Sequence, residues 1–239
     1  MYYNILDIGA SGGKSKCLPV FTKNLNRLNF LFNYFGVEPN EDALSSIIGY
    51  KEVYNDAINL TNGPATLYIT KDPYKTSLLK PNDSVVSDFM DYLDYEVTKE
   101  VIVNCITLEE LIGCLNVEID IIKLDIQGIE ASVLAEYSGL DIPVVICEAA
   151  SIEVYEGQTL SSTLLNRMAS LDYGLLDITF KSNATHENDF IFIKNTLFNS
   201  NLLRVSLLRV LMYWYTGNWK LIRREIKSII KNNVFQNHK

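Results

Sequence analysis

The stretch Ile5-Leu-Asp-Ile-Gly-Ala-Ser-Gly-Gly-Lys14 combines an apolar run, an acid and a glycine-rich turn. The apolar run predicts a buried β-strand over residues 3–8 that ends at Gly9, where the backbone can turn tightly. A helical pattern follows over about residues 13–30. A strand that passes through a glycine turn into a helix is the repeating unit of a parallel α/β sheet.

The same alternation continues along the chain. Further apolar runs predict strands at 32–38, 52–58, 120–126 and 143–148, and helical patterns lie at 40–48, 107–115, 128–137 and 159–171. The last two strands are apolar without strict alternation, as strands buried on both faces are. The pattern therefore predicts a doubly wound, mostly parallel sheet.

Two segments depart from this pattern. Residues 64–70 alternate and follow Thr61-Asn-Gly, so they predict a hairpin-like addition after the third strand. Near the end, residues 174–178 and 189–194 are two strands joined by ten residues without a helical pattern. Strands joined so closely run antiparallel, so we expect one reversed strand near the C-terminus.

Composition supports one large domain. The chain has 239 residues, of which 48% are hydrophobic, enough to bury a sizeable core. Its start has no basic and apolar leader, and no apolar run reaches the length of a membrane span. The four cysteines lack metal-site spacing, so we expect buried free thiols in a reducing cytoplasm.

The net charge of −8 conceals an asymmetry. Residues 202–239 contain eight Lys or Arg and one acid, a net charge of +7, so the rest of the chain carries −15. An acidic body argues against a protein that coats nucleic acid. The basic tail predicts an anionic contact of its own.

The first glycine turn carries a candidate ligand site. Its pattern, Gly9-x-x-Gly12-Gly13, differs from the G-x-G-x-x-G of dinucleotide folds, and Asp7 would repel a pyrophosphate. A carboxylate here suits a ligand that carries an ammonium group, with Gly9 and Ser11 beside it. The alternative is a plain strand–helix turn.

Acids also end the later strands. Glu38 could accept hydrogen bonds from both hydroxyls of a ribose, and Asp56 could accept one from an adenine amino group, although a surface acid beside a turn is common. Asp125 and Glu148 follow the two buried strands, at the edge where ligands bind in such sheets. Glu130 is expected in the first turn of a helix, where negative charge is favoured.

These motifs, in this order and spacing from about residue 3 to residue 195, resemble the FkbM-type methyltransferase family. The most diagnostic element is Lys123-x-Asp125-x-x-Gly128-x-Glu130-x-x-Val-Leu. The resemblance implies a class I methyltransferase (Rossmann-like) fold, S-adenosylmethionine as methyl donor and O-methylation, often of sugar hydroxyls. It also implies that Asp7, Gly9 and Glu38 hold the cofactor and that Asp125 lines the site.

The chain departs from the family in two ways. Gln127 stands where the family usually has an acid, which removes a charge beside the site. The chain also begins almost at its first strand, so we expect the N-terminal segment that helps to cover the family's site to be missing.

Methyl transfer to a hydroxyl also requires removal of its proton. His186 lies between the two closing strands, whose hairpin is expected at the cofactor edge, so it could be a general base. The alternative is an exposed loop histidine, and Asp125 and Glu148 are the other candidates. The acids show no metal-site spacing, so we predict no metal.

The tail predicts two helices split at Thr216-Gly-Asn, and we divide the chain into a methyltransferase domain, 1–197, and a basic helical tail, 198–239. We expect the first helix to pack on the sheet or in a homodimer. The second tail helix could pack in the same way, or it could contact the anionic lipids at the inner face of the cell membrane.

The sequence therefore predicts a cytoplasmic S-adenosylmethionine-dependent O-methyltransferase that acts on a sugar, glycan or glycosylated acceptor. The alternatives are a methyltransferase for a small non-sugar metabolite and a catalytically decayed nucleotide-binding or interaction module.

Overall fold

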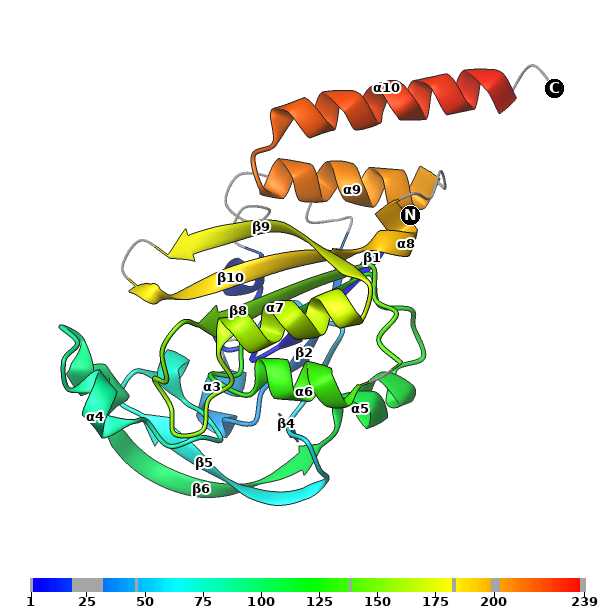
Figure 1. Ribbon diagram of the computed structural model, residues 1–239. Coiled ribbons are helices and arrows are strands. Elements are labelled where there is room, and N and C mark those ends of the chain that lie inside the picture. The colour runs from blue at the N-terminus through cyan, green and yellow to red at the C-terminus, as the bar shows by residue number, and fades with distance from the viewer. Residues whose placement is uncertain are drawn as a thin grey trace.

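The computed structural model describes residues 2–18, 32–45, 47–137, 139–181, 184–198 and 203–236. Its centre is a seven-stranded sheet in the order β3-β2-β1-β7-β8-β10-β9 (Figure 1). The strands are β1 (Tyr3–Ile8), β2 (Phe32–Val37), β3 (Glu52–Tyr54), β7 (Ile121–Leu124), β8 (Val144–Ala150), β9 (Tyr173–Lys181) and β10 (Ala184–Lys194).

Neighbouring strands from β3 to β8 are parallel, and β10 is antiparallel to both β8 and β9. The expected closing pair is thus confirmed, with longer strands than expected because β9 and β10 extend into the segment between them. A mostly parallel α/β sheet closed by one reversed strand confirms the expected class I methyltransferase fold.

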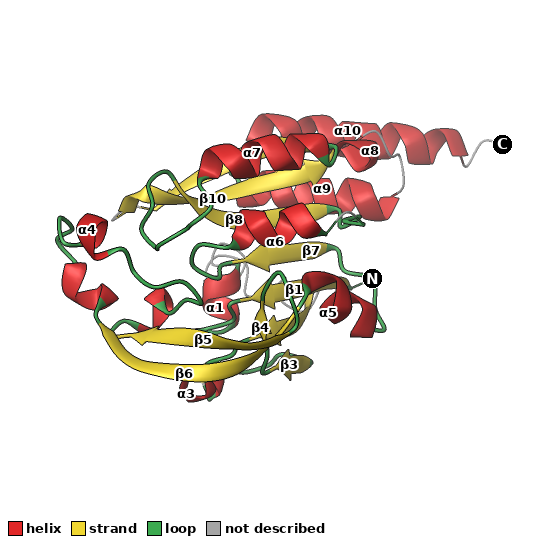
Figure 2. Ribbon diagram, turned by 60° about the horizontal axis from the view of Figure 1, so that its bottom comes forward, coloured by secondary structure: helices red, strands yellow, loops and turns green. Residues whose placement is uncertain are grey.

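A second sheet has the order β4-β6-β5 (Figure 2), with β4 (Ala57–Ile58), β5 (Gly63–Thr70) and β6 (Val97–Ile106). The single strand expected over 52–58 is therefore wrong. Its first part, β3, joins the main sheet, whereas the buried Ala57 and Ile58 pair with β6. The strand expected at 64–70 is present, but its antiparallel partner β6 comes far later in the sequence.

The connection between β5 and β6 is the part that the sequence did not predict. It contains three short helices, η2 (Pro73–Lys75), α4 (Asp83–Val86) and η3 (Tyr92–Tyr95). The hydroxyl of Ser77 and the backbone of residues 68 and 77 tie this connection to β5 and to the end of β7.

The remaining helices are α1 (Lys14–Cys17), α3 (Glu41–Leu44), α5 (Leu108–Cys114), α6 (Glu130–Glu136), α7 (Ser161–Ser170), α8 (Asn195–Phe198), α9 (Leu203–Tyr215) and α10 (Trp219–Gln236). Most of the helix expected over 13–30 lies outside the described residues. Thr107 is the N-cap of α5, as expected, since its hydroxyl accepts a hydrogen bond from the Glu110 amide at 3.2 Å.

Side chains alternate between the two faces of the sheet along each strand, and each face has its own hydrophobic core. Leu6 and Ile8 of β1 pack on one face with buried residues of α5, α6 and α7. Tyr3 and Ile5 point to the other face, where Leu208 and Met212 of α9 cover them. The first tail helix therefore packs on the sheet, and each fully buried side chain contributes about 1.5–3 kcal/mol.

Helix α10 lies outside α9 (Figure 1) and contacts it through a buried ion pair. Arg209 Nε lies 3.0 Å from Glu225 Oε1, and its Nη2 lies 3.0 Å from Ser206 Oγ. Among the described residues, no helix is both long enough and apolar enough to cross a membrane. Three of the four free cysteines are buried as expected, whereas Cys114 is exposed.

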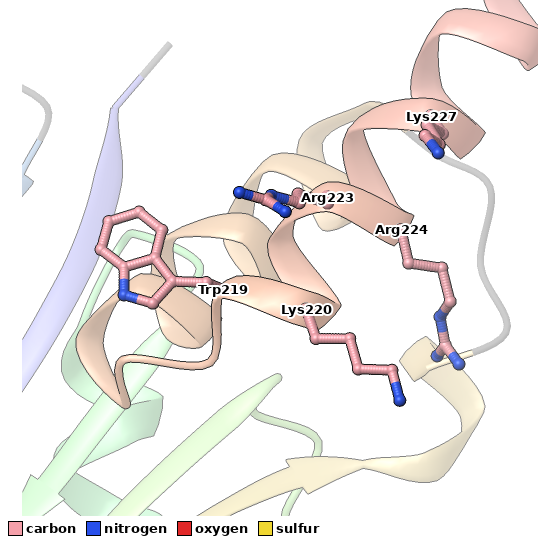
Figure 3. A pocket seen from close by; sticks show the side chains of 5 residues that line it. All are labelled: Trp219, Lys220, Arg223, Arg224 and Lys227. Carbon is pink, nitrogen blue, oxygen red and sulfur yellow. The ribbon is translucent and has the colours of Figure 1, made fainter.

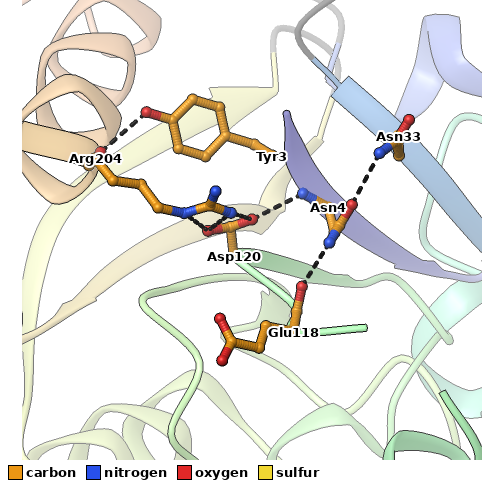
Figure 4. A network of polar contacts seen from close by, with 6 residues as sticks. All are labelled: Tyr3, Asn4, Asn33, Glu118, Asp120 and Arg204. Atoms are coloured by element: carbon orange, nitrogen blue, oxygen red, sulfur yellow. Dashed lines mark hydrogen bonds and ion pairs between the residues drawn. The ribbon is translucent and has the colours of Figure 1, made fainter. Parts of the chain in front are cut away.

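A polar network fastens α9 to the amino ends of β1 and β7 (Figure 4). Arg204 Nη2 contacts both carboxylate oxygens of Asp120, at 2.8 and 2.6 Å. The Asn4 amide donates to Asp120 Oδ2 at 2.8 Å, and the Tyr3 hydroxyl donates to the Arg204 carbonyl at 2.9 Å. The first turn of α9 is thus bonded to the starts of β1 and β7.

We predict that Arg204→Ala lowers the free energy of unfolding by about 1–2 kcal/mol, because Asp120 is left buried without its cation while the guanidinium itself is partly screened by water. Urea unfolding at neutral pH measures the change. Arg223→Ala, at an exposed position of α10, is the control and should change stability by less than about 0.5 kcal/mol. Equal effects of the two substitutions would contradict the role of the network.

Candidate active site

A cavity of about 850 Å³ opens at the carboxyl ends of the central strands. This is the edge at which open α/β sheets bind ligands. Its wall combines strand-end residues, the connection between β5 and β6, and the β9–β10 pair. The lining residues include Gly9, Ser11, Glu38, Lys75, Lys123, Asp125, Gln127, Glu148, Glu187 and Asp189.

Gly9 sets the turn at the end of β1. Its φ of 85° lies in the left-handed region that favours glycine, and an added Cβ would lie 1.9 Å from the carbonyl oxygen of Asp125. The Gly9 and Ala10 amides both donate to the carbonyl of Val37, at 3.0 Å. The ends of β1, β2 and β7 therefore meet at this one residue.

Glu38 follows β2 and is only 5% exposed. Its Oε1 accepts a hydrogen bond from the Asn40 amide at 2.9 Å. Burial raises the pKa of Glu38 to about 7, although hydrogen bonds from the Asn40 and Ser11 amides oppose the shift. Apolar Val37, Ala57 and Ile58 lie beside it in the wall. This end of the cavity thus pairs a carboxylate with an apolar surface.

The other end is lined by four acids from two strands, β8 and β10, and from the loop after β7: Asp125, Glu148, Glu187 and Asp189. Lys123 is the buried cation among them, with Nζ 2.7 Å from Asp125 Oδ2. Burial alone would lower the pKa of Lys123, but the carboxylates of Asp125, Asp7 and Asp189 outweigh burial and raise it well above its ordinary value. Lys123 therefore stays charged and balances part of the acidic wall.

Gln127 bridges two of these acids. Its Nε2 donates to Asp125 Oδ1 and to Glu148 Oε2, both at 2.9 Å. Its Oε1 lies 2.8 Å from the hydroxyl of the buried Tyr155. The φ of Gln127 is 59°, a left-handed conformation that costs a non-glycine residue about 1–3 kcal/mol. Hydrogen bonds on both ends of the amide hold it in this conformation.

Glu130 holds the loop that contains Gln127 through backbone hydrogen bonds. Its two carboxylate oxygens accept hydrogen bonds from the amides of Ile126 and Gly128, at 3.0 and 2.9 Å. Burial raises the pKa of Glu130 to about 7. The Ser77 hydroxyl also donates to the Gln127 carbonyl at 2.6 Å. Glu130 is thus a structural residue of the loop that presents Asp125 and Gln127.

The connection between β5 and β6 covers the cavity. Residues 72–78 line it, including Tyr74, which is 46% exposed, and Lys75, whose Nζ lies 2.9 Å from the Tyr95 hydroxyl. Residues 72–78 therefore form one side of the cavity wall.

The structure brings five of the predicted residues together in the cavity wall: Gly9, Ser11, Glu38, Asp125 and Glu148. Asp7, Asp56 and His186 lie outside this wall. Asp7 is 1% exposed and accepts a hydrogen bond from the Tyr50 hydroxyl at 2.5 Å. Asp56 accepts one from Asn104 Nδ2 at 2.6 Å, which ties the third-strand segment to β6.

His186 stacks on Phe89, with ring centroids 4.5 Å apart. It alternates along β10 with Glu187 and Asp189, which line the cavity, so its side chain points elsewhere. The expectation of an exposed loop histidine also does not hold, because His186 lies within β10 and is half-buried.

Sequence reasoning missed Lys123, Glu187 and Asp189 as site residues, and it treated Gln127 only as a departure from the family. A period of two along β10 would have identified the two acids, since Asp189 stands opposite Glu148 in the sheet. The roles of Lys123 and Gln127 depend on tertiary contacts that no local pattern contains.

The cavity fits the cofactor that the resemblance implies. Gly9 and Ser11 line it at the glycine turn, and Glu38 with its apolar neighbours suits a nucleoside. Within the described part of the chain, no three His, Cys, Asp or Glu side chains are placed to hold a metal ion.

We predict that Gln127→Glu makes stability depend on pH. A third carboxyl group against Asp125 and Glu148 would have a raised pKa, so its proton stabilises the fold at low pH and this stability is lost as pH rises through that pKa. Relative to the native chain, the variant should lose about 1–3 kcal/mol between pH 5 and pH 8, measured by urea unfolding.

Gln158→Glu is the matched control. The Gln158 Oε1 already accepts hydrogen bonds from the amides of Val154 and Tyr155, so a carboxylate oxygen can replace it. If the difference in free energy of unfolding between the Gln127 variant and the native chain stayed constant across pH, Gln127 would not contact ionised carboxylates.

Comparison with known proteins identifies the family. The methyltransferase FkbM domain matches residues 7–175, well over half of the chain. No curated protein matches the chain.

Solved structures resemble the fold at low sequence identity. Magnesium protoporphyrin IX methyltransferase from Synechocystis PCC 6803, with bound SAM, is 9% identical, with 81% of this chain and 70% of that chain covered and a TM-score of 0.40. TrmK from M. capricolum, in complex with S-adenosyl-homocysteine, is 13% identical, with coverages of 97% and 91% and a TM-score of 0.41. Because these scores are low, the assignment rests on the family match: the chain belongs to the FkbM methyltransferase domain family, and it is an S-adenosylmethionine-dependent methyltransferase.

Proposed function

We propose that this methyltransferase acts on a hydroxyl group of a sugar, glycan or glycosylated acceptor. The observation that carries the proposal is the acidic end of the cavity, where Asp125, Glu148, Glu187 and Asp189 line one wall. Ionised carboxylates are hydrogen-bond acceptors only, and hydroxyl groups are donors that match them.

In this proposal the cofactor lies along the Gly9 and Glu38 side of the cavity, which meets the acidic end at Asp125. Gly9 and Ser11 hold its amino-acid portion through the open turn, and Glu38 accepts hydrogen bonds from its ribose hydroxyls. When bound, S-adenosylmethionine supplies an electrophilic methyl group. Asp7, buried behind the turn, supports Lys123 and Tyr50 and does not contact the ligand.

The acceptor's proton goes to the carboxylate pair Asp125–Glu148 in this proposal. Gln127 holds both groups through one amide, which fixes their spacing. Lys123 fixes the other oxygen of Asp125 at 2.7 Å. A carboxylate that is positioned in this way can accept a hydroxyl proton as the methyl group is transferred.

The same geometry favours an active enzyme over a decayed module. In a decayed site Gln127 would be a tolerated loss of charge, yet here it bonds to both acids and keeps a strained backbone conformation. Four free thiols support a reducing compartment such as the cytoplasm. A small non-sugar hydroxyl compound remains the alternative acceptor within this reaction class.

We predict that affinity for S-adenosylhomocysteine rises with pH through about 7, because burial raises the pKa of Glu38 to about 7 and the ionised form accepts the ribose hydroxyls better. Glu38→Gln should remove this pH dependence and weaken binding by about 1–3 kcal/mol. Calorimetric titration between pH 6 and pH 8 measures both. Glu41→Gln, an exposed neighbour, should behave as the native chain; an unchanged pH profile in Glu38→Gln would exclude the residue from the site.

The acceptor class is tested with a radioactive methyl donor, offered with separate pools of oligosaccharides, glycosylated metabolites and non-sugar alcohols. Product mass then locates the methyl group. Asp125→Asn and Glu148→Gln should each lower kcat at least about tenfold while affinity for S-adenosylhomocysteine changes little. Transfer to the non-sugar pool alone would overturn the acceptor class, and full activity in both variants would overturn the assigned proton acceptor.

A further inference from the structure

Helix α10 turns an unusual face to solvent. Its buried side is the one that contacts α9, through Ile222 and the Glu225–Arg209 ion pair. On the outer side, apolar side chains remain in water: Trp219 is 60% exposed, Ile226 43% and Ile230 58%. We call these three residues the apolar strip.

Four basic residues border this strip. Lys220, Arg223, Arg224 and Lys227, here called the basic strip, surround a hollow of about 580 Å³ together with Trp219 (Figure 3). At about 100° of rotation per residue, the apolar strip occupies about 40° of the helix surface and the basic strip the adjoining 100°. The exposed half of α10 is therefore itself amphipathic.

We propose that this face of α10 binds to the surface of a membrane that contains anionic phospholipid. Phosphate-bearing headgroups match the basic strip, and the boundary between headgroups and acyl chains accommodates the apolar strip beside it. The rest of the chain supports an oriented contact, because residues 1–201 carry a net charge of −15 and are repelled by the same surface. Only the α10 side can then approach.

The charge and the exposed apolar side chains of this face argue against two other partners, a second copy of the chain and nucleic acid. A second copy of α10 would bring two basic strips against each other, which opposes a homodimer through this face. Nucleic acid would be attracted by the four cations, but it leaves Ile226 and Ile230 in water, and the acidic body repels it. A bilayer surface is the partner that uses both strips.

The test measures binding of the full chain to two kinds of vesicle. One contains phosphatidylcholine alone, and the other contains phosphatidylcholine with about 30% phosphatidylglycerol. We expect co-sedimentation with the anionic vesicles at low salt, release at high salt, and no binding to neutral vesicles. Free glycerol phosphate at the same phosphate concentration should not compete, which separates a bilayer from a soluble anion.

Two variants address the strips separately. Lys220→Gln with Arg224→Gln should lower the partition coefficient about thirtyfold, since each basic residue near an anionic surface contributes a factor of about five. The variant Ile226→Ser with Ile230→Ser should still bind anionic vesicles at low salt. It should be released from them at a lower salt concentration than the native chain. Lys51→Gln with Lys99→Gln, both exposed on the acidic body, is the control and should bind as the native chain does.

Trp219 offers a direct readout, because the chain has two tryptophans and Trp214→Phe leaves Trp219 alone. Its fluorescence should shift to the blue with anionic vesicles only. The proposal is overturned by absence of binding at low salt, by equal binding to both vesicle types, or by native-like binding of the folded Lys220/Arg224 variant. It is also overturned if these substitutions instead abolish dimer formation or binding to an oligonucleotide.

Discussion

The site depends on the close approach of two strand ends at Gly9. A side chain there would collide with the carbonyl oxygen of Asp125, at 1.9 Å from the Cβ position, so β1 and β7 can end side by side only with glycine at this residue. The Gly9 and Ala10 amides bond to Val37, which brings in the end of β2 as well. Because three strands end at one point, Glu38 and Asp125 line a single cavity although they are far apart in the sequence.

The site also requires that the repulsion between its buried carboxylates be offset. Several carboxylates meet at this edge, and ionised groups of like charge are costly when they are buried together. The buried cation Lys123 and the neutral donor Gln127 offset part of this cost. An acid in place of Gln127 would need its own proton or an added cation. The departure from the family pattern is therefore a change in how the acidic wall is stabilised, and it leaves Asp125 and Glu148 in the wall.

Much of this could be predicted from the sequence, because parallel strands place the residues that follow them at one edge. That reasoning located Gly9, Glu38, Asp125 and Glu148. Asp7 and His186 lie outside the cavity wall, since each alternates with neighbours that point to the other face of its strand. The cover formed by residues 72–78 could not be predicted, because its short helices depend on contacts such as that of Ser77 with Gln127.

The match to the family includes the nucleoside end of the cavity but only part of its acidic end. The match to the family covers residues 7–175, which include Gly9, Glu38 and Asp125. Glu187 and Asp189 come after it, on the reversed strand β10, and they line the acidic end. The end that suits a nucleoside thus lies within the matched segment, whereas the end proposed for the acceptor is completed by residues beyond it. Substitutions at Glu187 and Asp189 should therefore alter the choice of acceptor while leaving the cofactor end intact.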